Sequence, residues 1–241
     1  MKRLSRYGIE QIAARVIRAY KALPELARKA IQSVDPELLT IGLLQLTLEY
    51  LPLSPDGTVL GLTSYEPVGV AVYQKDRFSE LYMLDGSTVL VDSNVKADPT
   101  RRGRLNFTII HEASHHILKL LYPSEYGITQ KTHYYRATPH IRQTPITDWE
   151  EWQANTLAAA ILLPPELVRA GMETVGLGER MEMLNRVFRP AQYERFCQLA
   201  ELLGVSKFAL VIRMKQLNLL DKDYLGRPYD LIDIWVDEDD I

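Results

Sequence analysis

The chain has 241 residues, of which 46% are hydrophobic and 24% are charged, and its formal net charge is −3. This composition is ordinary for a globular protein with a sizeable core, so we exclude a wholly disordered chain. The longest stretch without a charged residue, Trp152–Pro165, is shorter than the roughly 18 residues that a membrane-spanning helix needs, so no membrane association is expected. An amphipathic start and a single cysteine, Cys197, predict a cytoplasmic protein without a secretory signal or an intramolecular disulfide.

The first part of the chain is expected to hold two helices and then a small sheet. Apolar residues from Ile9 to Tyr20 recur with the period of one helix face. Asp35-Pro36 predicts the N-cap and first residue of a second, short helix. Short apolar runs between residues 46 and 91 are separated by Asp-Gly and Glu-Pro turns, which predicts a small, mainly antiparallel sheet of hairpins.

The second part is expected to be mainly helical. We predict two central helices, Leu105–Leu121 and Asp148–Leu163, joined by a loop-like connector over 122–147 that contains several prolines. Beyond it the chain is expected to be helical to about Leu220 and to end in an acidic tail. The predicted fold class is therefore α+β, with a domain over residues 1–170 and a helical C-terminal region over 171–241.

A His-Glu-x-x-His string at residues 111–115 is typical of a zinc site on a helix. Residues four positions apart lie on one helix face, so His111 and His115 can share a metal ion. Glu112 projects about 100° away from His111, where its carboxylate can reach metal-bound water without being a ligand. His116 projects about 140° from His111 and is not expected to bind the metal.

A catalytic zinc needs a third protein ligand, and Glu151 in the second central helix is the best candidate. Asn155 follows one turn later on the same face, so we expect it to hydrogen-bond a ligand histidine and fix its tautomer. Glu150 projects about 100° away from Glu151 and is expected to be a solvated acid of the first helical turn. The small side chains of Ala154 and Ala158 are expected to let the two central helices pack closely.

These residues belong to two longer patterns. Residues 104–115 read Arg-x-Asn-Phe-Thr-Ile-Ile-His-Glu-Ala-Ser-His, and residues 151–164 read Glu-x-x-Ala-Asn-x-x-Ala-Ala-x-x-Leu-x-Pro. Over about residues 85–170 the chain resembles the ImmA/IrrE family of zinc metallopeptidases. The resemblance implies that His111, His115 and Glu151 hold zinc and that Glu112 is the catalytic acid/base. Leu157 stands where the family usually has Phe, which is a swap between core side chains.

The resemblance also implies an intracellular zinc endopeptidase with a specific protein substrate, such as a helix–turn–helix repressor encoded on a phage or mobile element. Zinc would lower the pKa of its bound water, and Glu112 would take that proton and deliver it to the leaving amine. The developing oxyanion needs a hydrogen-bond donor. The candidates in the connector are His133, Tyr134, Tyr135 and His140, for which packing within the loop is the alternative role.

The C-terminal region contains a segment with the rhythm of a helix–turn–helix, in which Gly204 lies in the turn and Ser206 caps the second helix. Residues 190–241 hold six Lys or Arg against ten Asp or Glu, a net charge of −4 that duplex DNA would repel. A packing or partner-docking role is therefore favoured, and no nucleic acid is expected. Two alternatives to the protease stay open: a non-catalytic, partner-binding regulator with structural zinc, and a DNA-binding regulator that uses these helices.

Overall fold

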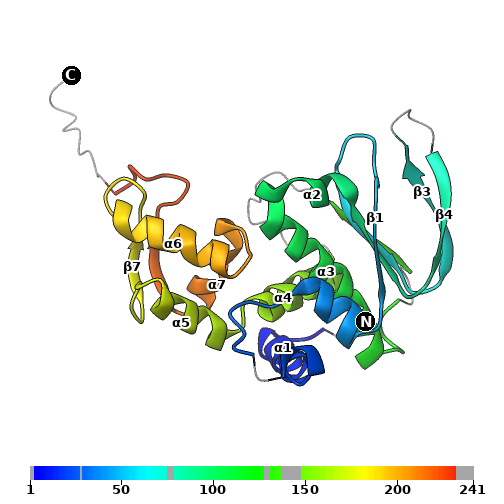
Figure 1. Ribbon diagram of the computed structural model, residues 1–241, viewed down its shortest axis with the longest axis horizontal. Coiled ribbons are helices and arrows are strands. Elements are labelled where there is room, and N and C mark those ends of the chain that lie inside the picture. The colour runs from blue at the N-terminus through cyan, green and yellow to red at the C-terminus, as the bar shows by residue number, and fades with distance from the viewer. Residues whose placement is uncertain (1–2, 28, 75–78, 128–130, 137–147, 232–241) are drawn as a thin grey trace.

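The computed structural model describes residues 3–27, 29–74, 79–127, 131–136 and 148–231. Helices and small sheets occur together, so the predicted α+β class is confirmed (Figure 1). Within the described ranges, no helix combines the length and the apolar character needed to cross a membrane.

The N-terminal helix α1 (Arg6–Lys21) forms as its apolar period predicts. Ser5 caps it by accepting a hydrogen bond from the Gly8 N–H at 3.2 Å. Its buried stripe consists of Ile9, Ile12, Ala13, Ile17 and Tyr20. This stripe faces the core, where α1 packs against the second central helix.

The segment after α1 begins with a 3₁₀ turn, η1 (Pro24–Leu26). Asp35 then accepts a hydrogen bond from the Leu38 N–H at 3.1 Å, as the predicted cap requires. The helix that follows is of π type over η2 (Leu38–Leu43), which the sequence pattern does not distinguish from an α-helix.

The main sheet has four strands, in the order β1 (Thr47–Leu51), β5 (Thr88–Asp92), β2 (Val59–Ser64) and β6 (Thr132–Arg136). β1 and β5 are parallel and the other neighbours are antiparallel. The expected mainly antiparallel sheet is therefore confirmed, with one parallel pair.

The sheet is covered on both faces. The hairpin of β3 (Pro67–Tyr73) and β4 (Ser79–Asp85) shares a hydrophobic cluster with Leu90 of β5. The neighbouring residues Val89 and Val91 point the other way and pack against the first central helix. This explains why β5 is apolar along most of its length and buried throughout.

A short helix, α2 (Ser93–Ala97), and a 3₁₀ turn, η3 (Pro99–Arg101), lead into the first central helix, α3 (Arg102–Leu121). The second central helix, α4 (Trp149–Leu162), packs along α3. Both helices lie where they are predicted, although α3 starts three residues earlier than expected.

The prediction of a loop-like connector is wrong for Thr132–Arg136, which forms β6. This segment is only five residues long, and its partner β2 lies far away in the chain: Thr132 is in register with Ser64. Periodicity cannot identify such a strand because its stability comes from a distant partner.

The C-terminal region contains α5 (Pro165–Thr174), β7 (Met181–Leu184), α6 (Pro190–Leu202), α7 (Lys207–Gln216) and β8 (Leu220–Asp223). The prediction of a purely helical region is wrong for β7 and β8, which pair in parallel. Each strand has only four residues, too few for a clear period. In Figure 1 these elements lie on one side of α3 and α4, and the sheet and hairpin lie on the other. The acidic tail falls outside the described residues.

The predicted turn between α6 and α7 is confirmed. Ser206 caps α7 by accepting a hydrogen bond from the Ala209 N–H at 3.1 Å, and Gly204 has a φ of +67°. The carbonyl of Gly204 accepts a hydrogen bond of 2.8 Å from the Asn106 side chain on α3. A Cβ on Gly103 would lie 2.5 Å from the Ser206 nitrogen, so the turn packs directly on the start of α3.

Candidate metal centre

The central helices bring His111, His115 and Glu151 together. The two histidines lie one turn apart on α3, and both are fully buried. Asp148 caps α4 by accepting hydrogen bonds from the Glu150 and Glu151 N–H groups, at 2.9 and 3.2 Å. This cap places Glu151 in the first turn of α4, where the helix dipole favours a carboxylate.

Donor atoms of these three residues, which we call the donor triangle, lie close together. The Nε2 atoms of His111 and His115 are 3.3 Å apart. His111 Nε2 lies 3.2 Å from Glu151 Oε2, and His115 Nε2 lies 3.2 Å from Glu151 Oε1. Zinc binds histidine nitrogen and carboxylate oxygen at about 2.0–2.2 Å, so the edge of a tetrahedral site measures about 3.3–3.6 Å. The observed spacings are close to this edge, so the three residues could hold a zinc ion.

The protonation states of these groups suit ligands. Burial lowers the pKa of His115 to about 3, so its ring is neutral at pH 7. Burial alone would raise the pKa of Glu151, but its contacts with His111, His115 and His133 hold that pKa well below its usual range. Neutral imidazole and ionised carboxylate are the forms that bind a metal.

The predicted hydrogen bond from Asn155 to a ligand histidine is not formed. The Nδ1 atoms of His111 and His115 are buried and have no hydrogen-bond partner among the described residues. Both rings turn Nε2 toward Glu151, so Nδ1 lies on the far side of each ring from the acid. Asn155 is half-buried on the next turn of α4. Helical spacing predicted its face correctly, but it could not predict the orientation of the rings.

His111 is oriented by aromatic packing instead. The ring of Tyr135 on β6 lies 4.2 Å from the His111 ring, centroid to centroid, and the ring of Phe107 lies 6.3 Å away.

Glu112 is fully buried, and neither of its carboxylate oxygens makes a hydrogen bond of good geometry with a described residue. Burial raises its pKa well above the usual range, and the negative charge of Glu151 raises it further. A Cβ at Gly61 would lie 2.5 Å from a Glu112 oxygen, so β2 can approach this carboxyl group only because residue 61 is glycine. A glycine inside an apolar strand often marks a close approach of another group. Gly61 is such a signal, and it was not used to predict the contact with Glu112.

His116 points away from the donor triangle, as predicted. Its Nε2 atom lies 2.6 Å from the Thr63 hydroxyl on β2. Burial lowers the pKa of His116 to about 4, so this ring is also neutral at pH 7.

Glu150 is not the solvated acid that the sequence predicts. It is buried, and one oxygen accepts a hydrogen bond of 3.0 Å from the Tyr65 hydroxyl. The same oxygen lies 3.2 Å from His133 Nε2. The expectation failed because both partners come from distant strands or loops, and helix periodicity carries no information about them.

The connector residues lie at different distances from the triangle. The His133 ring stacks on His115 with centroids 4.0 Å apart, and its Nδ1 lies 3.2 Å from a Glu151 oxygen. Burial opposes the protonation of His133, but Glu150 and Glu151 raise its pKa to about 9. Tyr134 is exposed, whereas burial and the charge of Glu112 raise the pKa of Tyr135 to about 12. His140 lies outside the described residues.

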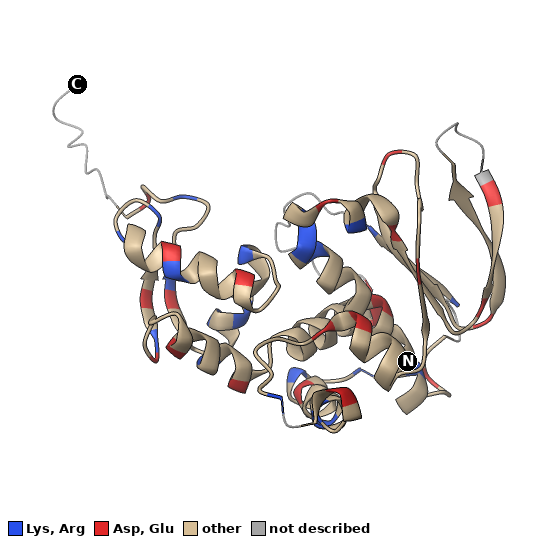
Figure 2. Ribbon diagram, in the orientation of Figure 1, with Lys and Arg blue, Asp and Glu red and all other residues tan. Residues whose placement is uncertain are grey.

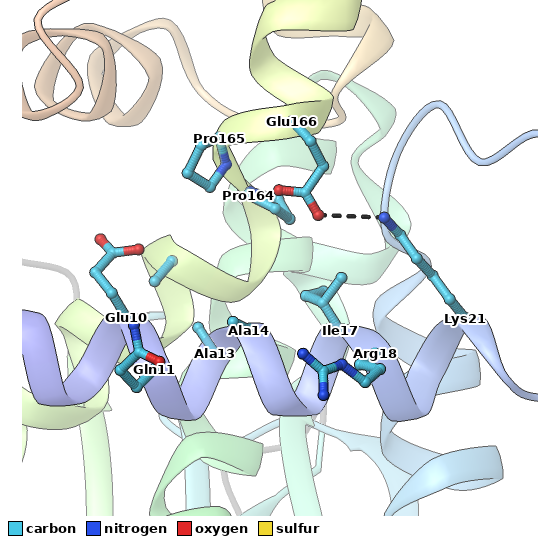
Figure 3. Close-up of a pocket in the computed structure, with 11 residues that line it drawn as sticks. Glu10, Gln11, Ala13, Ala14, Ile17, Arg18, Lys21, Pro164, Pro165 and Glu166 are labelled. Carbon is cyan, nitrogen blue, oxygen red and sulfur yellow. Dashed lines mark hydrogen bonds and ion pairs between the residues drawn. The ribbon is translucent and has the colours of Figure 1, made fainter.

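Two surface cavities lie apart from this cluster. One, of about 470 Å³, lies between α1 and the start of α5 (Figure 3). At its edge Lys21 of α1 pairs with Glu166 of α5 at 3.2 Å. The other, of about 630 Å³, lies between the start of α3 and the α6–α7 turn. Cationic side chains line this second cavity from both sides: Arg101, Arg102, Arg104 and Lys207. In Figure 2 the ribbon is blue, the colour of Lys and Arg, at the start of α3 and near the α6–α7 turn. Neither cavity is lined by a candidate metal ligand.

Neither a family model nor a curated protein sequence matches this chain.

Proposed function

We propose that this chain is a zinc-dependent endopeptidase in which His111, His115 and Glu151 hold the metal and Glu112 is the acid/base residue. The observation that carries the proposal is the burial of Glu112 directly beside the donor triangle. A zinc ion that only stabilises the fold needs no such carboxylate, and burying one without a good hydrogen bond is costly. A non-catalytic regulator with structural zinc would leave that cost unexplained.

The chemistry follows from the position of Glu112. When bound, zinc supplies a Lewis acid that polarises a peptide carbonyl and lowers the pKa of water toward about 7. A Glu112 oxygen accepts a proton from the attacking water, and the protonated carboxyl group then delivers it to the leaving amine. Because burial raises the pKa of Glu112, this carboxyl group is better matched to both transfers than a solvated one.

The substrate and the location are part of the same proposal. The resemblance of residues 104–115 and 151–164 to the ImmA/IrrE family supports a cytoplasmic enzyme that cleaves one regulatory protein. A helix–turn–helix repressor encoded on the same phage or mobile element is the substrate that this resemblance favours.

The C-terminal helices do not favour the DNA-binding alternative. Arg213 on α7 is only 2% exposed, and its guanidinium donates to the Leu163 carbonyl at 2.9 Å and pairs with Glu10. Lys215, the next cation of α7, pairs with Asp223 at 3.2 Å. The buried Arg213 stabilises packing within the chain, and Lys215 is neutralised by an acid on the surface, so both would bind the phosphate groups of DNA less well than unpaired cations.

The proposal is tested by Glu112→Gln, which keeps the shape of the side chain but cannot accept the water's proton. The chain is co-expressed with the repressor of its own locus, and the repressor is analysed for a shortened product. We expect wild type to cleave and Glu112→Gln to retain zinc while losing about 10²–10⁴-fold in rate.

Glu173→Gln makes the same chemical change at an exposed position of α5 and serves as the control, which should cleave like wild type. If wild type and Glu112→Gln both bind the repressor and leave it intact, the non-catalytic regulator is correct. If both cleave it equally, Glu112 is not the acid/base residue.

A further inference from the structure

Behind the donor triangle lies a second buried polar group, which consists of Tyr65, His133 and Glu150. We propose that His133 and Glu150 are positioning residues that hold the Glu151 carboxylate in its metal-binding orientation, with Tyr65 fixing Glu150. This inference rests on the proposed metal centre. It gives a role to Glu150, which is not one of the three proposed ligands.

The His133 ring spans the two adjacent acids of α4. The side chains of Glu150 and Glu151 diverge because neighbouring helical residues project about 100° apart. His133 Nδ1 lies 3.2 Å from Glu151 Oε1, and His133 Nε2 lies 3.2 Å from Glu150 Oε1. The Glu151 oxygen that faces His133 is the same oxygen that lies 3.2 Å from His115 Nε2. The ring can therefore fix the rotation of the ligand carboxylate.

The His133 ring itself has little freedom. It stacks on His115, with centroids 4.0 Å apart and an angle of 23° between the planes, and its side chain is 1% exposed. The Tyr65 ring contacts the His133 ring in an edge-on arrangement, and the centroids of these two rings are 5.2 Å apart. Because the ring is confined in this way, its contact with Glu150 also fixes its position beside Glu151.

Tyr65 holds Glu150 in turn. Its hydroxyl donates to Glu150 Oε1 at 3.0 Å and lies 3.2 Å from the main-chain oxygen of His115. A Cβ on Gly127 would lie 2.3 Å from the Tyr65 ring, so the chain leaves room for this ring only with glycine at that position. The group is thus tied to the helix that carries the histidine ligands.

A purely structural explanation of Glu150 is unfavourable. Its side chain is only 9% exposed, and the half-buried carboxylate of Glu151 follows it in sequence. Burying a charge beside a like charge costs free energy that an apolar side chain at this position would avoid. Glu150 contacts Tyr65 and His133, and His133 in turn reaches the Glu151 oxygen. This is the arrangement expected of a group that orients a metal ligand.

This arrangement also changes the role expected for His133. Both ring nitrogens lie 3.2 Å from carboxylate oxygens, although Nε2 makes no hydrogen bond of good geometry with a described residue. These contacts favour a positioning role for His133 over that of the oxyanion donor, for which it is one of four candidates. A rival assignment would make His115, His133 and Glu150 the metal ligands themselves, since these three could also surround an ion.

The test measures metal binding and needs no substrate. Zinc affinity is determined by competition with a chromogenic chelator, and the ligand set is followed in the visible spectrum of the cobalt-loaded protein. Glu150→Gln and His133→Leu should each weaken zinc binding by about 10–100-fold, the usual effect of removing an outer partner of a ligand. The cobalt spectrum of each variant should shift but keep the pattern of a four-coordinate ion.

Two further variants complete the design. His133→Asn restores a donor near the Nδ1 position and should recover part of the lost affinity, which loss of folding would not do. Glu66→Gln is the matched control, because Glu66 is a surface acid that follows Tyr65 and pairs with Lys131 at 2.6 Å. It should bind zinc like wild type.

Wild-type affinity in Glu150→Gln would overturn the proposal. So would loss of all metal from Glu150→Gln combined with retention in Glu151→Gln, which would make Glu150 the ligand. Wild type that binds neither zinc nor cobalt would overturn this inference and the proposed function together. Wild type that binds zinc but cleaves no partner would refute only the proposed function.

Discussion

The helix pairs α3–α4 and α6–α7 each have a buried face, but they bury different kinds of side chain. The α3–α4 pair buries four ionisable groups: His111, Glu112, His115 and Glu150. The α6–α7 pair buries apolar residues such as Phe196 and Leu210, and its one buried charge, Arg213, has matched partners. Protein interiors leave few buried polar atoms unpaired, so atoms that stay unpaired call for an explanation.

Within the described ranges of the chain, several such atoms belong to α3. They are His111 Nδ1, His115 Nδ1 and both carboxylate oxygens of Glu112. Packing and stability account for the buried side chains of α6–α7. They do not account for the unpaired polar atoms buried on α3. The difference supports the proposal that the functional site lies at α3–α4, whereas the α6–α7 turn contacts the start of α3.

The largest difference between the two regions should appear when a ligand is removed. We expect His115→Ala to weaken zinc binding by more than the roughly 10–100-fold typical of an outer partner. Cys197→Ala on α6, which removes the only thiol of the chain, should leave zinc affinity unchanged. Equilibrium dialysis with metal analysis measures both. Equal zinc content in wild type and His115→Ala would remove His115 from the ligand set.

A second difference should appear when the α3–α4 interface is overfilled. Ala158 is fully buried on α4, so Ala158→Leu should destabilise the chain by about 1–3 kcal/mol. Because the metal ligands lie on the same two helices, the melting temperature and the zinc affinity should fall together. Thermal denaturation and chelator competition measure the two effects. An unchanged melting curve would show that this interface is not tightly packed.

In the α6–α7 region, a substitution should lower the stability of the chain without changing its zinc affinity. Arg213→Met removes hydrogen bonds to Glu10 and to the Leu163 carbonyl and should cost about 1–3 kcal/mol in the free energy of unfolding. The zinc affinity of the folded variant should stay at the wild-type value. Urea unfolding gives the first quantity and zinc titration the second. A large loss of zinc affinity would show that the two regions are coupled more strongly than their contacts indicate.

The pH dependence should be a smaller effect that also originates in α3–α4. Burial lowers the pKa of His116 from 6.5 to about 4. Between these two pH values the His116 ring is protonated in the unfolded chain and neutral in the folded chain. The free energy of unfolding of wild type relative to His116→Gln should therefore fall as the pH decreases from about 6.5 to 4.

The opposite sign applies to His133. Its acidic neighbours raise its pKa to about 9, so its stabilising contribution is complete below pH 6.5 and is lost as the pH rises toward 9. Urea unfolding in the presence of a chelator, compared between wild type and His133→Leu, should show this loss on the alkaline side. A pH-independent difference would contradict the proposed ion pairs.

Elements with a long period or a clear cap could be predicted from the sequence. The stripe of α1, the Asp148 cap of α4 and the shared face of His111 and His115 follow from local rules. The strands β6 and β7 could not be predicted, because each is short and gains its stability from a distant partner. Within the site, Glu150 was misjudged for the same reason: its partners Tyr65 and His133 come from other parts of the chain.

Zinc X-ray absorption spectroscopy of the purified chain, combined with metal analysis, is the sharpest test of the proposed zinc site. We expect one zinc per chain, bound by two imidazole nitrogens and by oxygen ligands at about 2.0–2.2 Å, with no sulfur. In Glu151→Ala the affinity should fall sharply because one of the three protein ligands is lost. Full zinc occupancy and an unchanged spectrum in Glu151→Ala would contradict the account, because the third ligand would then be a different residue.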